Sequence, residues 1–173
     1  MLRLQLAGAD TLLTSSLCSA CPHSAAGCCA APPRVALSDI ARIVAHGGRD
    51  WLLREIAASR LVAAPGNLWL VLPRTVRTMP AAKEPLSACV YLGLMGCTIP
   101  HDRRSATCNY YVCEDALAHG GDGEAEARRA LDELVASFTR RDAELAKDVA
   151  TEWPTGHAFD GPFLDWLGAR ARA

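Results

Sequence analysis

The sequence predicts an α+β fold: a small, irregular cysteine-rich domain of short helices and a β-hairpin, followed by a long amphipathic C-terminal helix. The chain has 173 residues, half of them apolar, which is enough for one core built without disulfide staples. Its eight cysteines form two groups of four, and the segment after them has apolar residues at helical spacing. We therefore expect a cysteine-cluster metal-binding domain over residues 1–118 and a helical segment over residues 122–173 packed on it.

The first cysteine group lies in a loop rich in small residues and contains Cys18, Cys21, Cys28 and Cys29. Buried cysteine packs as a small hydrophobe and has no packing reason to cluster, so we expect a bound group or a covalent bond to hold these sulfurs together. Neighbouring side chains diverge in regular structure. Cys28 and Cys29 can therefore share one centre only in a distorted loop.

Two short helices are expected next. Ser38-Asp39 is typical of a helix start and Gly47-Gly48 of a stop, and Asp50 is expected to cap the second helix, which ends before Pro65-Gly66. The apolar residues at helical spacing are Ile40, Ile43 and Val44 in the first helix, and Trp51, Leu52, Leu53, Ile56 and Ala57 in the second.

Short strands are expected in the middle of the chain. Asn67 to Pro73 predicts a strand, and Arg74 to Pro85 a mixture of strand and loop. Cys89–Leu92 and Cys97–Ile99 predict the two arms of a hairpin, each with a cysteine, around the turn Gly93–Gly96.

The last third of the chain predicts helices. A helix is expected over residues 124–153, ended by Pro154, and a short one from Phe159 to Leu167. An amphipathic helix of this kind normally covers a core, and binding of a protein partner is the alternative. Its apolar face contains Leu131, Leu134, Val135, Phe138, Leu145 and Val149.

The second cysteine group, about sixty residues after the first, contains Cys89, Cys97, Cys108 and Cys113, and residues 109–112 fit a strand or a helical turn equally. A Cys-x-x-Cys turn such as Cys18 to Cys21 places two thiolates on one centre, and further cysteines complete a zinc site or hold an iron–sulfur cluster. The eight thiols thus fit two four-cysteine sites, one cluster with spare thiols, or a metal site with a redox pair.

Other side chains near the cysteines are weaker candidates for a role at a metal site. His23 and His101 are candidate ligands, although a lone loop histidine is more often a surface residue. Arg103 is a candidate hydrogen-bond donor to a thiolate site, Asp39 is expected at a helix start, and Tyr110-Tyr111 is expected in the core.

Composition and motifs exclude several function classes. The net charge of −1 provides no global positive field for nucleic acid or anionic lipid, and no apolar run is long enough to span a membrane. The first seventeen residues lack a signal-peptide core, so we expect a cytoplasmic protein with reduced thiols. No Walker loop, Gly-x-Gly-x-x-Gly, His-Glu-x-x-His or Gly-x-Ser-x-Gly motif is present. A role without catalysis is favoured, although an iron–sulfur centre or a low-pKa thiol of the Cys28-Cys29 pair would allow chemistry.

The cysteine motifs also resemble a known family. The resemblance lies in Cys18-x-x-Cys21 and Cys28-Cys29, in residues 35–40 (Val-x-Leu-Ser-Asp-Ile), and in Cys89-x-x-Leu92 with Gly96-Cys97-Thr98-Ile99. In these motifs the chain resembles the YkgJ-type cysteine cluster family, which is described as a zinc- or iron-chelating domain with a CxxCxxxCC-like signature. The chain departs from that signature in the six residues between Cys21 and Cys28. The resemblance implies metal chelation by cysteines.

The leading interpretation is therefore a protein that chelates zinc or iron, the latter also as an iron–sulfur cluster, through two groups of four cysteines. A thiol–disulfide redox protein and an accessory or interaction module of a larger enzyme, bound through the C-terminal helix, are the alternatives. The candidate metal ligands are Cys18, Cys21, Cys28, Cys29, Cys89, Cys97, Cys108 and Cys113.

Overall fold

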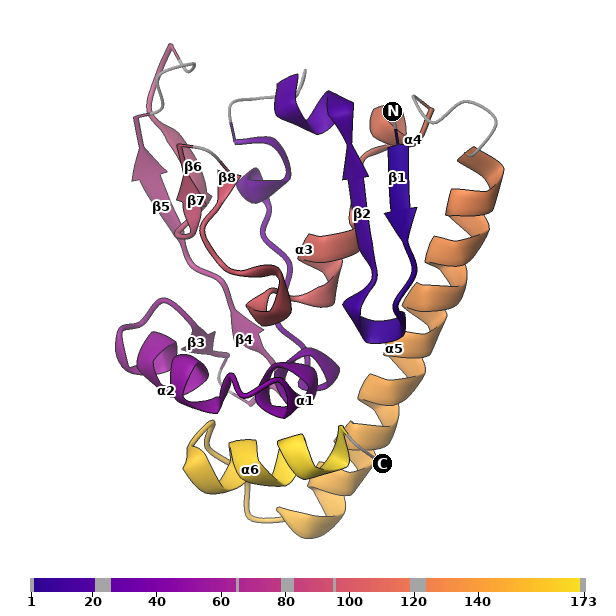
Figure 1. Cartoon of the computed structure of the whole chain (residues 1–173). Helices are drawn as coiled ribbons and strands as arrows, with labels where there is room; N and C mark the ends of the chain where they lie inside the picture. Colours follow the sequence, from indigo (N-terminus) through magenta and orange to yellow (C-terminus); the bar gives the residue numbers. More distant parts are fainter. Residues whose placement is uncertain are drawn as a thin grey trace.

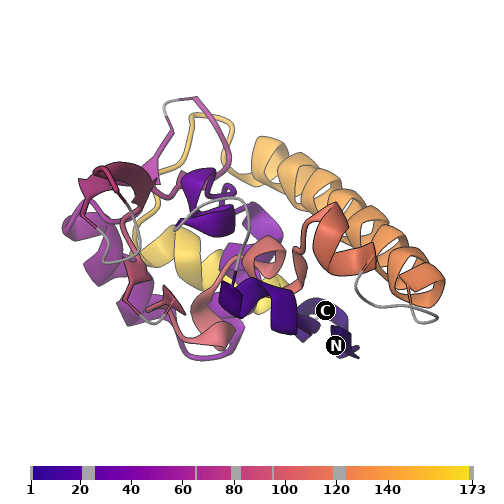
Figure 2. The ribbon, with the colours of Figure 1, turned by 90° about the horizontal axis from the view of Figure 1, so that it is seen from above.

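The computed structural model describes residues 2–20, 26–64, 66–78, 83–94, 96–118 and 124–171. It confirms the α+β fold, with helices and short antiparallel strand pairs around one main core. The long helix α5 (Glu124–Glu152) runs along one side of the molecule, and α6 (Gly161–Arg170) lies beneath the two short helices α1 and α2 (Figures 1 and 2). In the part of the chain described, no helix is long and apolar enough to cross a membrane.

The chain begins with a hairpin that the sequence analysis did not predict. Strand β1 (Leu2–Gln5) pairs antiparallel with β2 (Leu12–Ser15), with Leu4 opposite Leu13. Leu13 is buried in a small second core beneath helix α4 (Glu114–Ala118) and the first turns of α5. This hairpin lies beside α5 in Figure 1.

Both short helices are confirmed, as α1 (Leu37–Ala45) and α2 (Arg49–Ala57). The predicted cap of α2 is wrong, because Gly48 occupies the N-cap and Asp50 lies in the first turn. A Cβ atom at Gly48 would lie 2.5 Å from the Ile43 side chain, so only glycine fits this close approach between the two helices.

The strands are shorter than predicted and pair differently. Of the predicted strand 67–73, only residues 70–71 form a strand, β4. The first arm of the predicted hairpin 89–99 is wrong, because Cys89 is the last residue of strand β6 (Leu86–Cys89), where it lies opposite Arg74. Cys97 instead pairs with Leu92 in a tighter hairpin. The cross-strand partner of Cys89 comes from upstream, where residues 74–77 pair with residues 86–89. The antiparallel pairs are β3 (Val62–Ala63) with β4 (Leu70–Val71), β5 (Arg74–Arg77) with β6 (Leu86–Cys89), and β7 (Leu92–Gly93) with β8 (Gly96–Cys97).

Residues 109–112, which the sequence left open between strand and helical turn, are helical in their first half: Asn109 and Tyr110 end helix α3 (Ala106–Tyr110), and Tyr111 and Val112 connect it toward α4. Tyr110 packs against Phe138 of α5, with ring centroids 6.0 Å apart. The predicted core position of Tyr111 is wrong: α3 ends at Tyr110, and the Tyr111 side chain is 53% exposed.

The two C-terminal helices share the main core with α1. Helix α5 confirms the predicted helix and buries Leu145 and Val149 there, although Val135 on its middle turns is 45% exposed. Asp160 is the N-cap of helix α6, and its Oδ1 accepts a hydrogen bond from the backbone of Phe163 at 3.1 Å. Fully buried α6 residues pack on α1 and close the core; they are Phe163, Leu164 and Leu167.

Replacement of Phe163 by alanine is expected to lower the free energy of unfolding by about 3–5 kcal/mol, because it leaves a cavity among the aromatic rings around it. Trp153 packs edge-on against Phe163 at 5.3 Å, and Trp166 stacks on it at 5.7 Å. Urea unfolding followed by circular dichroism measures the change. Val76→Ala, at a side chain 72% exposed, is the control and is expected to stay within about 0.5 kcal/mol of the parent protein.

Candidate metal centre

Four cysteines from both sequence groups meet in one packing cluster. Cys89 is buried in the main core, and Cys29, Cys97 and Cys108 pack half-buried against that core. They come from four separate segments: the 3₁₀ turn Gly27–Ala30, strand β6, strand β8 and helix α3. The fold therefore combines one cysteine of the first group with three of the second.

The turn that carries Cys29 is attached to the two central hairpins. Ala26, just before it, is buried with Ala88 of β6 and Leu92 of β7. The guanidinium of Arg74 donates a hydrogen bond to the carbonyl of Ala30 at 3.4 Å, at the other end of the turn. Cys29 is thereby held against the strand that ends in Cys89.

The chain turns back after Cys89, and one backbone amide of this turn acts on the Cys89 thiol. The backbone of Thr98 donates to the carbonyl of Tyr91 at 2.9 Å and closes the turn. The backbone N–H of Tyr91 donates to the Cys89 sulfur. Amide hydrogen bonds to cysteine sulfur are a common feature around metal-bound thiolates.

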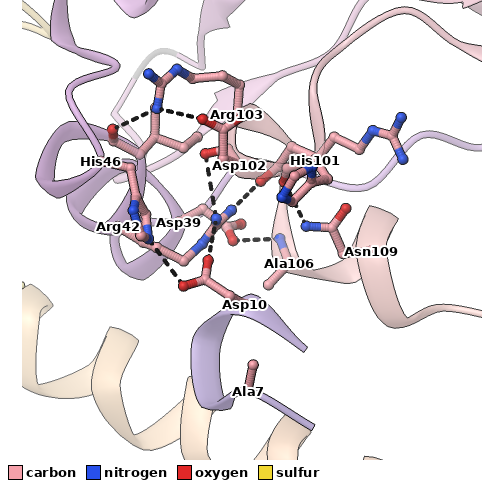
Figure 3. A network of polar contacts seen from close by, with 12 residues as sticks. Ala7, Asp10, Asp39, Arg42, His46, His101, Asp102, Arg103, Ala106 and Asn109 are labelled. Atoms are coloured by element: carbon pink, nitrogen blue, oxygen red, sulfur yellow. Dashed lines mark hydrogen bonds and ion pairs between the residues drawn. The ribbon is translucent and has the colours of Figure 1, made fainter. Parts of the chain in front are cut away.

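Asp39 places the fourth cysteine. As predicted, it lies at the start of α1, where its Oδ2 accepts a hydrogen bond from the backbone of Ala36 at 3.1 Å. The same carboxylate accepts from Ser105 Oγ at 2.9 Å. It also accepts from the backbone of Ala106 at 2.6 Å (Figure 3). These last two bonds join α1 to the first turn of α3, two residues before Cys108. Burial raises the pKa of Asp39, and its hydrogen bonds oppose that rise.

Arg42, one turn further along α1, holds the loop between Cys97 and Cys108. Its side chain is buried, and it donates to Asp10 Oδ1 at 3.0 Å, to the carbonyl of Asp102 at 3.4 Å and to the carbonyl of Arg104. Asp10 also contacts His46 Nε2 at 3.0 Å (Figure 3). One face of α1 thus organises both the N-terminal hairpin and the thiol-bearing loop.

The thiols of the cluster influence one another. Burial raises the pKa of Cys29 to about 11 and that of Cys108 to about 12, and repulsion from neighbouring thiolates adds to both shifts. Burial and Cys97 raise the pKa of Cys89 in the same way. Cys29, Cys89 and Cys108 therefore favour the protonated thiol at neutral pH, so Cys29 is not the low-pKa thiol that the sequence allowed in the Cys28-Cys29 pair.

Two arginines supply positive charge to the cluster, and sequence reasoning missed both. Arg104 donates to the carbonyl of Ile99 at 2.7 Å, and its charge lowers the pKa of Cys29. Arg77 donates to the carbonyl of Val90, and its charge lowers the pKa of Cys89.

The proposed role of Arg103 is wrong. This side chain pairs with Asp102 at 3.3 Å and donates to the carbonyl of Ile43 near the end of α1 at 3.5 Å. The adjacent arginine pair was visible in the sequence, but local pattern cannot tell which of two neighbours faces the thiols. The loop conformation assigns that position to Arg104.

The remaining sequence candidates lie elsewhere. Cys113, like Leu17, packs against the second core, whereas the four-thiol cluster lies on the main core. Cys18 and Cys28 are exposed. The His101 side chain is exposed as well, and only its carbonyl is used, as acceptor for Asn109 Nδ2 at 2.7 Å. Cys21 and His23 lie outside the described residues.

Within the described ranges, no three cysteine, histidine, aspartate or glutamate side chains are grouped closely enough to hold a metal ion as they stand. The four thiols are packing neighbours without being a preformed tetrahedral site. Binding of a metal at this cluster therefore requires the sulfurs to move closer together.

Comparisons of the chain with protein-family models, curated proteins and solved structures found no match. The resemblance to the YkgJ-type family stays a prediction that rests on the cysteine motifs alone.

Glu55 links the thiol turn to helix α2. It is buried and accepts hydrogen bonds from Arg60 Nε at 2.6 Å and Arg60 Nη2 at 2.7 Å, and another from the Tyr91 hydroxyl. The Arg60 hydrogen bond is the main cause that lowers the pKa of Glu55. Since Tyr91 also donates its amide to Cys89, the carboxylate of Glu55 helps to fix the backbone beside that thiol.

The Asp39→Ala variant is expected to lose about 2–3 kcal/mol of unfolding free energy, because its hydrogen-bond donors lose their buried acceptor. Released from α1, the start of α3 should also expose Cys108 to alkylation, which mass spectrometry of the reduced protein measures. Asp142→Asn is the matched control. Asp142 Oδ1 accepts from the backbone of Ser38 at 2.8 Å, so this change perturbs α1 alone and should leave Cys108 alkylation unchanged. Equal alkylation of Cys108 in both variants would refute the positioning role of Asp39.

The Glu55→Gln variant is expected to be less stable than the parent at pH 7, with a difference that shrinks on acidification. The lowered pKa means that the unfolded chain binds the proton more readily. The stabilisation that ionised Glu55 provides is therefore fully present above pH 4.5, its ordinary pKa, and is lost as the pH falls through its lower pKa in the folded protein. Urea unfolding at pH 7 and pH 3.5 measures it. The exposed Glu133→Gln change is the control, and a gap that stays constant with pH would contradict the assignment.

Proposed function

We propose that this protein binds zinc or iron, the latter also as an iron–sulfur cluster, through cysteine thiolates, and that Cys29, Cys89, Cys97 and Cys108 form one centre. The observation that carries the proposal is that these four thiols, from segments up to 79 residues apart, lie on the main core near enough for their charges to act on one another. Packing alone gives no reason for such convergence.

The donor set and its surroundings fit the chemistry of such a centre. Thiolate sulfur is the donor that zinc and iron–sulfur clusters prefer. Four thiolates around a divalent cation leave a net charge of −2, and the guanidinium groups of Arg77 and Arg104 offset it. The Tyr91 amide already donates to the Cys89 sulfur. When bound, the metal replaces the thiol protons and adds its binding free energy to the stability of the fold.

The other four candidate ligands stay within the proposal as a second group. Cys18 and Cys113 lie on neighbouring elements, since the 3₁₀ turn Ser16–Ala20 contacts α4, directly after Cys113. A second metal ion held by the remaining cysteines would give two metal equivalents per chain.

The two alternatives have less support. A redox-active cysteine needs a thiolate, and the environment of Cys29, Cys89 and Cys108 favours the protonated thiol instead. An accessory role with a protein partner on α5 stays a proposal whose supporting observation is the exposed Val135 on the middle turns of that helix.

Protein purified without oxygen is expected to contain stoichiometric metal: zinc if colourless, or iron with acid-labile sulfide if brown. The Cys97→Ser variant should lose the metal of the four-thiol centre. Removal of the metal should lower the melting temperature of the parent but not that of this variant, because only the parent gains binding free energy from the ion. Elemental analysis, the visible spectrum and thermal unfolding measure these effects.

Cys113→Ser is the informative comparison, because Cys113 is also half-buried but lies outside the cluster. It should keep the metal of the four-thiol centre, and any loss would be confined to a second equivalent. Unchanged metal content in Cys97→Ser, or reduced parent protein that binds neither zinc nor iron, would refute the proposal.

A further inference from the structure

A cavity of about 400 Å³ lies between helix α1 and the middle of helix α5. The structure describes the whole of α5, and none of its residues between Ala127 and Leu145 is buried. The middle of this helix therefore packs loosely against the rest of the protein. On the opposite wall, Ala41 and Ala45 have side chains too short to fill the space, and the 3₁₀ turn Gly8–Asp10 contributes a third wall.

Each of the two helical walls is formed by one face of its helix. The lining residues are spaced by three or four along the chain, as neighbours on a helix face are. Most of the helical lining is apolar, and each wall has one arginine, Arg42 on α1 and Arg141 on α5. An apolar cavity with a few polar groups of this kind is typical of small-molecule sites. Besides Arg42, the main lining residues are Ser38, Ala41 and Ala45 of α1, and Leu134, Phe138 and Arg141 of α5.

The hydrogen-bonding groups left unused around this cavity are mainly donors. Asp10 is the acidic residue of the described lining, and both of its oxygens are occupied: Oδ1 accepts from Arg42, and Oδ2 contacts His46. The Arg42 side chain is 6% exposed, and its buried Nε–H has no acceptor among the described residues. The Ser38 hydroxyl, in a residue 8% exposed, makes no hydrogen bond within the described part of the chain either. These groups favour a ligand that supplies acceptor oxygens.

The charge of the lining favours an anion as well. Arg42 and Arg141 carry two positive charges against the one negative charge of Asp10, and His46 stands beside them. Arg141 is 38% exposed and also pairs with Glu144 at 3.3 Å, but Glu144 is not among the described lining residues.

A second cavity, of about 280 Å³, shares Ser38 and Phe138 with the first. Its described lining contains two carboxylates, Asp39 and Asp142, and one guanidinium, that of Arg34. The negative charges repel an anion. The larger cavity is therefore the one that suits an anionic ligand.

We propose that the larger cavity binds a small organic anion, a carboxylate with a short apolar body. The carboxylate accepts hydrogen bonds from Arg141 and from Ser38, beside Arg42. Guanidinium groups match the geometry of a carboxylate and bind it with charge-assisted hydrogen bonds. The apolar body lies against Ala41 and Phe138. No cysteine is among the described lining residues, so this inference is independent of the proposed metal-binding function.

The test uses the reduced full chain and isothermal titration calorimetry at pH 7. The probes are hexanoate, the neutral hexanamide and the cation hexylammonium, which share one apolar body and differ in charge. Arg141→Gln removes the guanidinium, and Ala45→Leu fills the cavity. Arg140→Gln is the matched control, because Arg140 is the exposed neighbour of Arg141 and is not among the described lining residues. The melting temperature of each variant shows that it folds, and Ser137→Leu, at an exposed lining residue of α5, replaces Ala45→Leu if that variant does not.

The parent is expected to bind hexanoate about tenfold more tightly than hexanamide, and to bind hexylammonium least. Arg141→Gln should weaken hexanoate binding about tenfold, the cavity-filling variant should abolish it, and Arg140→Gln should leave it unchanged. Equal affinity for hexanoate and hexanamide would overturn the inference, because the arginines would then not recognise the charge. Parent protein that binds no hexanoate would overturn it as well. So would a cavity-filling variant that binds hexanoate like the parent, because the anion would then lie elsewhere.

Discussion

The candidate centre depends on one buried carboxylate. Asp39 accepts hydrogen bonds from the start of its own helix and from Ser105 and Ala106 at the start of α3. Its negative charge is unfavourable in the core, and these donors together with nearby Arg42 compensate for it. Without this contact, the start of α3 would rely on the hydrogen bond from Arg42 of α1 to the carbonyl of Arg104. Cys108 would then be held less firmly beside the other thiols.

The thiol cluster resists ionisation in the metal-free protein, and a cation would stabilise its thiolates. Cys29, Cys89 and Cys108 repel one another as thiolates and are kept protonated by burial. A bound cation would reverse that balance, because four negative sulfurs would surround a positive charge. Metal binding would then add its free energy to that of folding, beside the hydrogen bonds of Asp39 and Arg74 that already hold the thiol-bearing segments.

Sequence reasoning performed best where the signal was local. The helices containing Ile40 and Ile43, or Leu145 and Val149, were predicted because apolar spacing and stop signals act within one turn of helix. It failed where a distant segment decides the outcome. The partner of Cys89 is Arg74, and the cap of α2 is Gly48 because a neighbouring helix approaches it closely. Neither fact has a local pattern in the chain.

The sequence by itself determined the α+β class, the main helices and the grouping of the cysteines along the chain, since composition, periodicity and spacing are properties of the chain. Only the tertiary structure decided which cysteines meet: Cys29 joins Cys89, Cys97 and Cys108, while Cys113 packs on another core. It also decided that Arg104, and not Arg103, faces the thiols. The physical reason is that these choices depend on contacts between segments far apart in the chain, such as the one that Asp39 makes between α1 and α3.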